Sequence, residues 1–298
     1  MSTHTFIAGD WGTTQLRLYL CNDEQVIATK SGRGIGALQR TPAEEFASVA
    51  GEWLSAQGID RIVLAGMVGS RNGWHETAYV PCPASLVEVR AAFAHVSHEA
   101  HDIAIVPGLS CTSPLNSPDV MRGEETQLLG ALEVRESLRT GRHVIALPGT
   151  HSKWAVLEDA TIVRFQTAIT GELFALLRQH STLLKAGVAT TNAIDEDAFD
   201  AGARSASSAA LIQQLFQVRS RQLVEGWSAD HAASFLSGLL IGADVDSAHR
   251  LFAPTHVTLI CEPTLASLYS RALAPRGVTV ERLDGADCVL AGLRALAA

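Results

Sequence analysis

Two polar turns, about half a chain apart, contain the residue types that bind phosphate groups. Residues 10–14 read DWGTT, and residues 148–153 read PGTHSK. Each turn combines a Gly-Thr pair with further polar side chains, so backbone N–H groups and hydroxyls can point at phosphate oxygens. A plain hairpin turn uses the same residue types. The repetition favours a function, because two such turns facing each other would hold opposite sides of a triphosphate.

Asp10 stands at the end of a short apolar stretch, just before the first Gly-Thr pair. A carboxylate at this place suits Mg²⁺, a hard cation that prefers oxygen ligands and keeps several of its waters. Acidic residues are also common in ordinary turns. The sequence therefore makes Asp10 a candidate metal ligand, with a plain turn as the alternative.

Two further carboxylates, Glu124 and Glu125, lie at the start of a helix predicted for residues 123–138. Glutamates in a first helical turn often only complement the helix dipole. In the functional interpretation, one of them orients and deprotonates a substrate hydroxyl. Adjacent helical residues point about 100° apart, so both cannot reach one hydroxyl. We expect Glu124 to be the base, with the reverse assignment to Glu125 as the alternative.

Three other segments carry residue types that are typical of binding sites. Residues 65–74 read AGMVGSRNGW, in which glycines allow close approach of the backbone, Arg71 can fork a carboxylate and Trp74 can cover a sugar. Pro107-Gly108 ends another predicted strand at what should be the same sheet edge. Thr170-Gly171 precedes a helix whose N-terminus can face a phosphate. The alternatives are a surface loop, a turn and an ordinary helix cap.

The elements that position these segments repeat in the two halves of the chain. Each half opens with a strand, a Gly-Thr turn and a return strand, at 6–10 and 15–20 and again at 143–147 and 153–157. Further strands are predicted at 61–65, 103–106, 161–167, 255–261 and 278–282, and helices at 42–56, 171–184, 211–224, 230–251, 263–274 and 286–297. The Ala/Ser-rich stretch 186–208 is expected to be loop-rich. This pattern predicts a duplicated α/β architecture with a central cleft, divided into residues 1–140 and 141–298.

Composition and charge narrow the function classes. The net charge of −8 makes nucleic acid and anionic membranes poor partners. The longest apolar stretches are too short to span a bilayer, and the first twelve residues lack the basic and apolar segments of a secretory signal. Five widely spaced cysteines without a CxxC pair indicate reduced thiols in a cytoplasm. The absence of GxxxxGK[ST] excludes a P-loop enzyme.

Seven segments, taken in order, closely resemble the 2-dehydro-3-deoxygalactonokinase family. They read GDWGTTQLRLYL, GMVGSRNGWHETAYVPCP, VPGLS, MRGEETQLLGAL, LPGTHSKWA, TGELFALL and LSGLLIGADV, and they run along nearly the whole chain. This family acts in D-galactonate breakdown and belongs to the superfamily of hexokinase, actin and Hsp70-type ATPases. The resemblance implies an α/β fold of two ribonuclease-H-like lobes around a central cleft.

The resemblance also implies ATP, Mg²⁺ and transfer of the γ-phosphoryl group to the C6 hydroxyl of 2-dehydro-3-deoxy-D-galactonate. Asp10 would hold the metal, and Glu124, with Glu125 beside it, occupies the position of the superfamily's catalytic Asp. The nucleotide-binding residues would be Gly12, Thr13, Thr14, Gly149, Thr150, His151, Ser152, Lys153, Thr170 and Gly171. The sugar-acid site would use Gly66, Met67, Gly69, Ser70, Arg71, Trp74, Pro107 and Gly108. The superfamily's Gly-rich adenosine segment is replaced by LICEPTL at 259–265, which leaves the adenine contacts open.

Three other functions fit parts of the same pattern. A kinase of the epimeric 2-dehydro-3-deoxy-D-gluconate would need the same residues, because the sequence does not fix the preference at C4. A phosphohydrolase would use water in place of the sugar, which the Arg- and Trp-containing loop disfavours. A sugar-sensing regulator would not need complete phosphate turns. We expect a cytoplasmic enzyme whose partners are a sugar acid and ATP, with a monomer and a homodimer both open.

Overall fold

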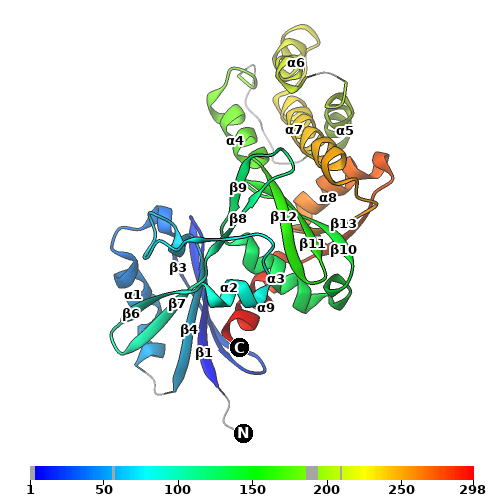
Figure 1. Cartoon of the computed structure of the whole chain (residues 1–298). Coiled ribbons are helices and arrows are strands. Elements are labelled where there is room, and N and C mark those ends of the chain that lie inside the picture. The colour runs from blue at the N-terminus through cyan, green and yellow to red at the C-terminus, as the bar shows by residue number, and fades with distance from the viewer. Residues whose placement is uncertain (1–3, 56–57, 186–193, 209) are drawn as a thin grey trace. The chain divides into compact units, whose positions relative to one another are not determined.

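The computed structural model describes residues 4–55, 58–185, 194–208 and 210–298, which form two compact units (Figure 1). Unit 1 comprises Met1–Arg142, Val156–Phe165 and Asp284–Ala298, and unit 2 comprises His143–Ala155 and Gln166–Leu283. The predicted division at residue 140 places the last helix in the second lobe, whereas the contacts of that helix place it in unit 1.

Unit 1 is built on a six-stranded sheet in the order β3-β2-β1-β4-β7-β6. The first three strands pair antiparallel, β1, β4 and β7 pair parallel, and β6 returns antiparallel to β7. Their bounds are β1 (Thr5–Trp11), β2 (Gln15–Asn22), β3 (Val26–Arg33), β4 (Ile59–Gly66), β6 (Ala94–His98) and β7 (His101–Ile105). The parallel pairing places the carboxyl ends of β1 and β4, at Trp11 and Gly66, side by side.

The second large sheet repeats the order of the first. Its strands run β12-β11-β10-β13-β14, so the third, second, first and fourth strands of each sheet are neighbours in the same order. In both sheets one further strand, β7 or β14, pairs parallel with the fourth. The bounds are β10 (Arg142–Leu147), β11 (Ser152–Glu158), β12 (Thr161–Ala168), β13 (His256–Ile260) and β14 (Thr279–Leu283). This repetition confirms the predicted pair of ribonuclease-H-like lobes.

A small third sheet, β5-β8-β9, lies in unit 1 and was not predicted. Its strands are β5 (Tyr79–Pro81), β8 (Gly108–Thr112) and β9 (Pro118–Met121). Strands β5 and β9 have three and four residues, which is too short for alternating hydrophobicity to be recognised. Strands β3 and β6 were also missed, because none of their residues is fully buried and their less exposed positions include Lys30, Gly32 and His98.

The helices of unit 1 are α1 (Pro42–Leu54), α2 (Leu86–Ala91), α3 (Glu124–Val134) and α9 (Gly285–Ala297). Helix α1 begins with a capping box between Thr41 and Glu44, and it packs on the sheet through Phe46. Helices α3 and α9 cross so closely that a Cβ at Gly130 or Gly292 would meet the other helix's backbone. This crossing fixes α9 to unit 1, and with it the start of α3.

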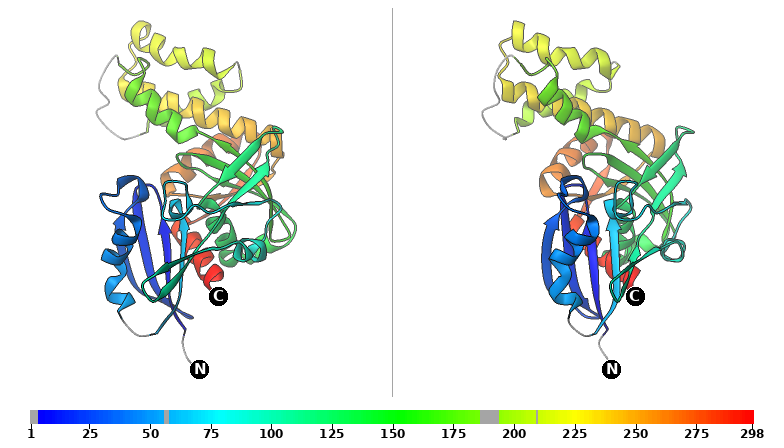
Figure 2. Two further views of the ribbon diagram at one scale, coloured as in Figure 1. Left: turned by 60° about the vertical axis from the view of Figure 1, so that its left-hand side comes forward. Right: turned by 90° about the vertical axis from the view of Figure 1, so that its left-hand side faces the viewer.

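The helices of unit 2 are α4 (Thr170–His180), α5 (Glu196–Ser205), α6 (Leu211–Val224), α7 (Ala229–Phe252) and α8 (Pro263–Leu273). Helices α4, α5 and α6 gather around α7 (Figure 2). The prediction of a loop at 186–208 was wrong for α5, which Asp195 caps and which packs Phe199 against α7. Residues 186–193 of that stretch lie outside the described part of the chain. No described helix is long and apolar enough to cross a membrane.

Candidate active site

The first Gly-Thr turn is hydrogen-bonded to the backbone of residues 35–36 and is exposed to solvent. The N–H of Gly12 donates to the carbonyl of Gln15 at 2.9 Å and closes the turn between β1 and β2. The carbonyls of Gly12 and Thr13 accept the N–H groups of Ile35 and Gly36 at 3.0 and 2.9 Å. Thr13 and Thr14 are exposed. Their hydroxyls are therefore accessible to a phosphate group.

Asp10 lies just inside this turn and is largely shielded from solvent. Asp10 is paired with Arg17 across the β1–β2 ladder. Its Oδ1 lies close to Gly66, 3.5 Å from the position that a Cβ on that glycine would occupy. Burial raises the pKa of the Asp10 carboxyl, and the charge of Arg17 partly offsets this effect. Burial makes the charged form of a carboxylate less favourable, and a cation bound beside the carboxylate stabilises that charged form.

The donor set at Asp10 fits Mg²⁺. The described residues contain no cluster of three or more His, Cys, Asp or Glu side chains that could enclose a metal. Mg²⁺ in phosphate-transfer sites is usually held by one or two carboxylates, with waters and phosphate oxygens completing its shell. One carboxylate next to two exposed threonine hydroxyls matches that kind of site.

Two glycines bring the end of β4 to the start of α3. Gly66 and Gly123 both have left-handed backbones, with φ of 92° and 103°, which a residue with a side chain rarely adopts. A Cβ on Gly123 would stand 3.6 Å from the Cα of Gly66. Asp10, Gly66 and Gly123 therefore lie in one neighbourhood of unit 1.

Glu124 and Glu125 have different surroundings at this helix start. The side chain of Glu125 is fully buried and accepts hydrogen bonds from the N–H of Gly123 at 2.7 Å and the hydroxyl of Thr126 at 3.2 Å. Burial, with a smaller contribution from the charge of Glu124, raises the pKa of Glu125 to about 8. Glu124 is half-buried and accepts the N–H of Arg122 at 3.1 Å. Only Glu124 therefore has a surface that a substrate can reach.

The Gly-rich loop after β4 presents Arg71 but not Trp74. The Arg71 side chain is 85% exposed, and its Nε lies 3.6 Å from a carboxylate oxygen of Glu76. Trp74 is half-buried and packs against the core of unit 1, edge-on to Trp11 and tilted against Phe46. Ser70 turns its hydroxyl back to the carbonyl of Met67 at 2.8 Å. Arg71 is thus the member of the predicted sugar-acid set with a freely accessible charged group.

The base of this loop is tied to the start of α3 by Arg122, which sequence reasoning did not select. Its guanidinium donates to the hydroxyl of Thr77 and, at 3.0 Å, to the carbonyl of Thr77. It also lies over the ring of Tyr79 at 4.6 Å. A Cβ on Gly69 would meet Arg122 at 2.8 Å, which explains the glycine there. Pro107 and Gly108 are buried behind Tyr79, so they shape the loop's support.

The second Gly-Thr turn, in unit 2, is packed against the start of α4. The carbonyl of Thr150 accepts the N–H of Glu172 at 2.9 Å, and His151 pairs with the Glu172 carboxylate. A Cβ on Gly171 would stand only 3.0 Å from the Cα of Thr150. The predicted pairs Gly149-Thr150 and Thr170-Gly171 are therefore brought together, and Gly171 is required for that contact.

Two predicted phosphate ligands are turned away from solvent. The Ser152 side chain is 1% exposed, and its hydroxyl is bonded to the Tyr269 hydroxyl at 2.8 Å. Lys153 is 3% exposed, and its ammonium donates to the carbonyl of His151 at 3.3 Å. In this conformation both side chains support the turn from within.

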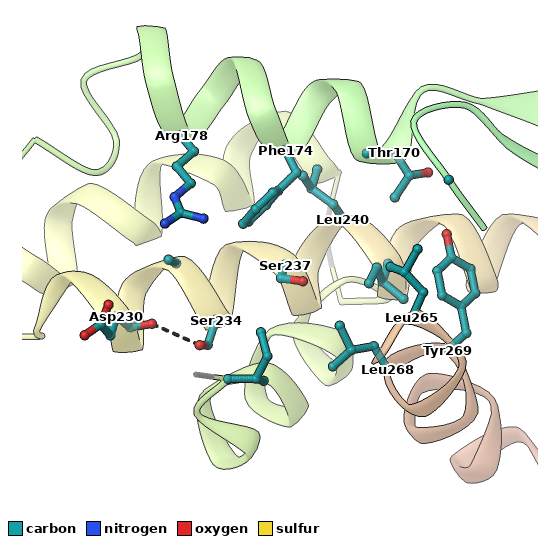
Figure 3. Close-up of a pocket in the computed structure, with 15 residues that line it drawn as sticks. Thr170, Phe174, Arg178, Asp230, Ser234, Ser237, Leu240, Leu265, Leu268 and Tyr269 are labelled. Atoms are coloured by element: carbon teal, nitrogen blue, oxygen red, sulfur yellow. Dashed lines mark hydrogen bonds between the residues drawn. The ribbon is translucent and has the colours of Figure 1, made fainter. Parts of the chain in front are cut away.

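A cavity of about 320 Å³ in unit 2 begins at this turn (Figure 3). Thr170 and Tyr269 lie at one end, and Arg178 and Asp230 lie at the other. Gly149 also lines the cavity and lies against Gly171, the neighbour of Thr170. Most of the lining between them is apolar: Phe174, Ala233, Leu240, Ile241, Leu265 and Leu268. An elongated apolar cavity with a phosphate-type turn at one end has the form and size of a nucleotide site.

Sequence reasoning missed most of this lining. The α7 residues Asp230, Ala233, Ser234, Ser237, Leu240 and Ile241 recur every three or four positions, which is the spacing of one helix face. The signal was hidden because α7 is buried on nearly all sides. Leu265 lies in the segment 259–265 where the adenine contacts were left open.

Comparison with known proteins gives one consistent family. The family model described as 2-keto-3-deoxy-galactonokinase matches residues 10–296. The 2-dehydro-3-deoxygalactonokinase of Escherichia coli K12 is 36% identical, over 99% of this chain and 98% of its own. The Rhizobium meliloti protein DgoK1, named for the same activity, is 37% identical, over 98% and 96%. A crystal structure from Sinorhizobium meliloti, described as a 2-dehydro-3-deoxygalactonokinase protein, has 35% identity and a TM-score of 0.88, over 98% of this chain and 97% of that one.

Proposed function

The chain belongs to the 2-keto-3-deoxy-galactonokinase family, and we propose that it transfers the γ-phosphoryl group of ATP to the C6 hydroxyl of 2-dehydro-3-deoxy-D-galactonate. The observation that carries this proposal is the family match over residues 10–296, together with relatives of that name across almost the full chain. The two turns, the cavity and the buried helix start supply the groups that such a transfer needs.

ATP would occupy the cavity of unit 2. Its phosphates would lie at Gly149, Thr150 and Thr170, where backbone N–H groups and a helix start favour negative charge. Its base would lie between the apolar side chains, toward Arg178. The acidic chain thus uses local backbone groups rather than a basic surface to hold an anion.

Asp10 would hold Mg²⁺, mostly through water, with the Thr13 hydroxyl beside it. When bound, the ion would neutralise charge on the β- and γ-phosphates and so favour departure of the leaving group. Asp10 itself does not touch the sugar acid in this proposal. Its part is to keep one negative charge at the end of β1.

The sugar acid would bind to the loops of unit 1. Arg71 would pair with the substrate carboxylate in place of Glu76, and Glu124 would accept the proton of the C6 hydroxyl. The oxygen then attacks the γ-phosphorus in line with the bond to ADP, and the proton stays on Glu124 until it is released to solvent. Most of the rate enhancement would come from positioning and charge stabilisation.

A coupled ATPase assay across a panel of 2-keto-3-deoxy acids tests this proposal. We expect ADP release that depends on added sugar acid, with the galactonate-derived acid turned over at the highest kcat/KM. Higher kcat/KM for the gluconate-derived epimer would move the activity to that substrate. ADP release at the full rate without any sugar acid would show a phosphohydrolase instead.

The cellular setting is also a proposal. All five cysteines, Cys21, Cys82, Cys111, Cys261 and Cys288, are free thiols, which supports a reducing cytoplasm. Sedimentation of the purified protein at several concentrations would decide between the monomer and the homodimer.

A further inference from the structure

Asp244 is a buried carboxylate that binds three elements of unit 2 at once. It lies on α7, is 7% exposed, and accepts a hydrogen bond from the indole N–H of Trp154 on β11 at 2.9 Å. Its second oxygen accepts the hydroxyl of Thr170, the first residue of α4, at 3.0 Å and the hydroxyl of Tyr269 on α8 at 2.6 Å. A buried carboxylate is costly unless several donors surround it, and here three do.

The same network reaches the second phosphate turn. The Tyr269 hydroxyl is bonded to the Ser152 hydroxyl, the residue that joins the turn to β11. Burial raises the pKa of Asp244, and the hydrogen bonds from Tyr269, Thr170 and Trp154 oppose that shift. The hydroxyls of Thr170 and Tyr269 both donate to one oxygen of Asp244, so this side chain fixes the orientation of both.

The residues that Asp244 binds are those at the phosphate end of the cavity. Thr170 and Tyr269 both line it, and they lie at the same end in Figure 3. Asp244 is one helical turn along α7 from Leu240 and Ile241, which also line the cavity. One carboxylate therefore connects the cavity's walls on α4, α7 and α8 with the turn at Gly149–Ser152.

We propose that Asp244 is a positioning residue for the nucleotide, which sets the phosphate turn, the start of α4 and the Tyr269 wall in the geometry that ATP needs. It acts through Thr170, Tyr269 and Ser152 and does not itself touch the ligand. This inference rests on the proposed function in one respect, namely that the cavity of unit 2 holds ATP.

Asp244→Asn tests the inference, because it keeps the size of the side chain but replaces one acceptor oxygen with a donor. We expect the KM for ATP, and the Kd of a non-hydrolysable ATP analogue by calorimetry, to rise roughly tenfold or more, the usual effect of losing a charge-assisted hydrogen bond. The KM for the sugar acid should stay within about twofold, because no unit 1 group is altered. Trp154→Phe removes one hydrogen-bond donor to Asp244 and leaves the cavity lining unchanged. It should also raise the KM for ATP, by a smaller factor, and leave the KM for the sugar acid unchanged.

Gln222→Leu is the matched control. Gln222 is 7% exposed in unit 2 and donates to the carbonyls of Leu183 and Val218 at 2.6 Å, away from the cavity lining. Its loss should lower the Tm and leave both KM values unchanged. If Asp244→Asn and Trp154→Phe also lower only the Tm, Asp244 is merely structural and the inference is overturned. If Asp244→Asn does not fold, the KM for ATP of Trp154→Phe alone decides between a positioning and a structural role. A wild-type protein that binds no ATP analogue would refute the proposed function instead.

Discussion

The carboxylate of Glu125 lies inside the protein and accepts the N–H of Gly123 at 2.7 Å, whereas that of its neighbour Glu124 lies half-exposed and accepts the N–H of Arg122 at 3.1 Å. Both side chains therefore accept backbone N–H groups just before α3, but only one of them faces a place that a substrate can reach. This difference supports the assignment of the base to Glu124 and gives Glu125 a structural part.

Glu124→Gln should lower kcat by about 10²- to 10⁴-fold, the usual scale for losing a general base. The KM for the sugar acid and for ATP should change little, since the amide keeps the shape of the side chain. Steady-state kinetics on a folded variant measure both. An active Glu124→Gln beside a folded but inactive Glu125→Gln would reverse the assignment.

Glu125→Gln should change the pH dependence of stability. Because burial raises the pKa of Glu125 to about 8, the folded protein keeps a proton that the unfolded chain loses above about pH 4.5. Ionisation therefore opposes folding increasingly as pH rises from about 4.5 to 8. Glutamine carries no such charge, so the variant's Tm relative to the wild type should be higher at pH 9 than at pH 5. A Tm difference that does not vary with pH would show that Glu125 is not protonated in the folded state.

Asp10→Asn should nearly abolish turnover while the protein stays folded. Burial raises the pKa of Asp10, so the neutral amide costs the fold little, but it cannot organise Mg²⁺ as a carboxylate does. The measurement is kcat as a function of Mg²⁺ concentration, with the Tm as the check on folding. A kcat near that of the wild type at saturating Mg²⁺ would exclude the metal role.

Arg71→Ala should raise the KM for the sugar acid more than the KM for ATP. Losing a forked contact to a carboxylate costs about 1.5–3 kcal/mol, which is about 10- to 150-fold. Glu76→Gln is the matched control, because it removes the present partner of Arg71 but not the guanidinium. That variant should bind the sugar acid as well as the wild type or better. If Arg71→Ala raises only the KM for ATP, Arg71 belongs to the nucleotide site.

Gly171→Ala should weaken ATP binding and lower stability. The new methyl group would stand 3.0 Å from the Cα of Thr150 and 3.1 Å from the carbonyl carbon of Gly149, so the phosphate turn has to move. Overpacking of this kind costs about 1–3 kcal/mol. Gly51→Ala, on α1 where a Cβ meets no atom within 4 Å, should leave the KM for ATP unchanged. Equal KM values for ATP in both variants would show that the turn does not bind phosphate.

The strands and helices that flank the two turns could be predicted because hydrophobic periodicity and turn glycines are local signals. The return strand with Leu16 and Leu18 facing the core, and the helix start at Thr41-Pro42, are examples. Helix α5 was missed although Asp195 caps it and its buried residues Ala198, Phe199, Gly202 and Ala203 recur at helical spacing. The many Ala, Ser and Gly residues of the stretch 186–208 outweighed that short pattern, and the packing of Gly202 and Phe199 against α7 is visible only in the structure.

The candidate site shows the same limit. Residue types singled out Asp10, Glu124 and the two Gly-Thr turns as candidates, but they could not show that Trp74 packs against the core or that Ser152 is buried behind its turn. Arg122, Asp244 and Tyr269 were missed because their importance lies in partners distant in sequence, such as Thr77 for Arg122 and Trp154 for Asp244. A spacing pattern cannot report a contact across 90 residues.

The central claim, that the chain is an ATP-dependent kinase of a 2-keto-3-deoxy sugar acid, is tested most directly by analysing the product. Purified protein is incubated with ATP, Mg²⁺ and 2-dehydro-3-deoxy-D-galactonate, and the mixture is examined by mass spectrometry and ³¹P NMR. The account predicts one ADP for each sugar acid consumed and a phosphate monoester whose phosphorus couples to the C6 protons. Inorganic phosphate with unchanged sugar acid, or a phosphate on another carbon, would contradict it.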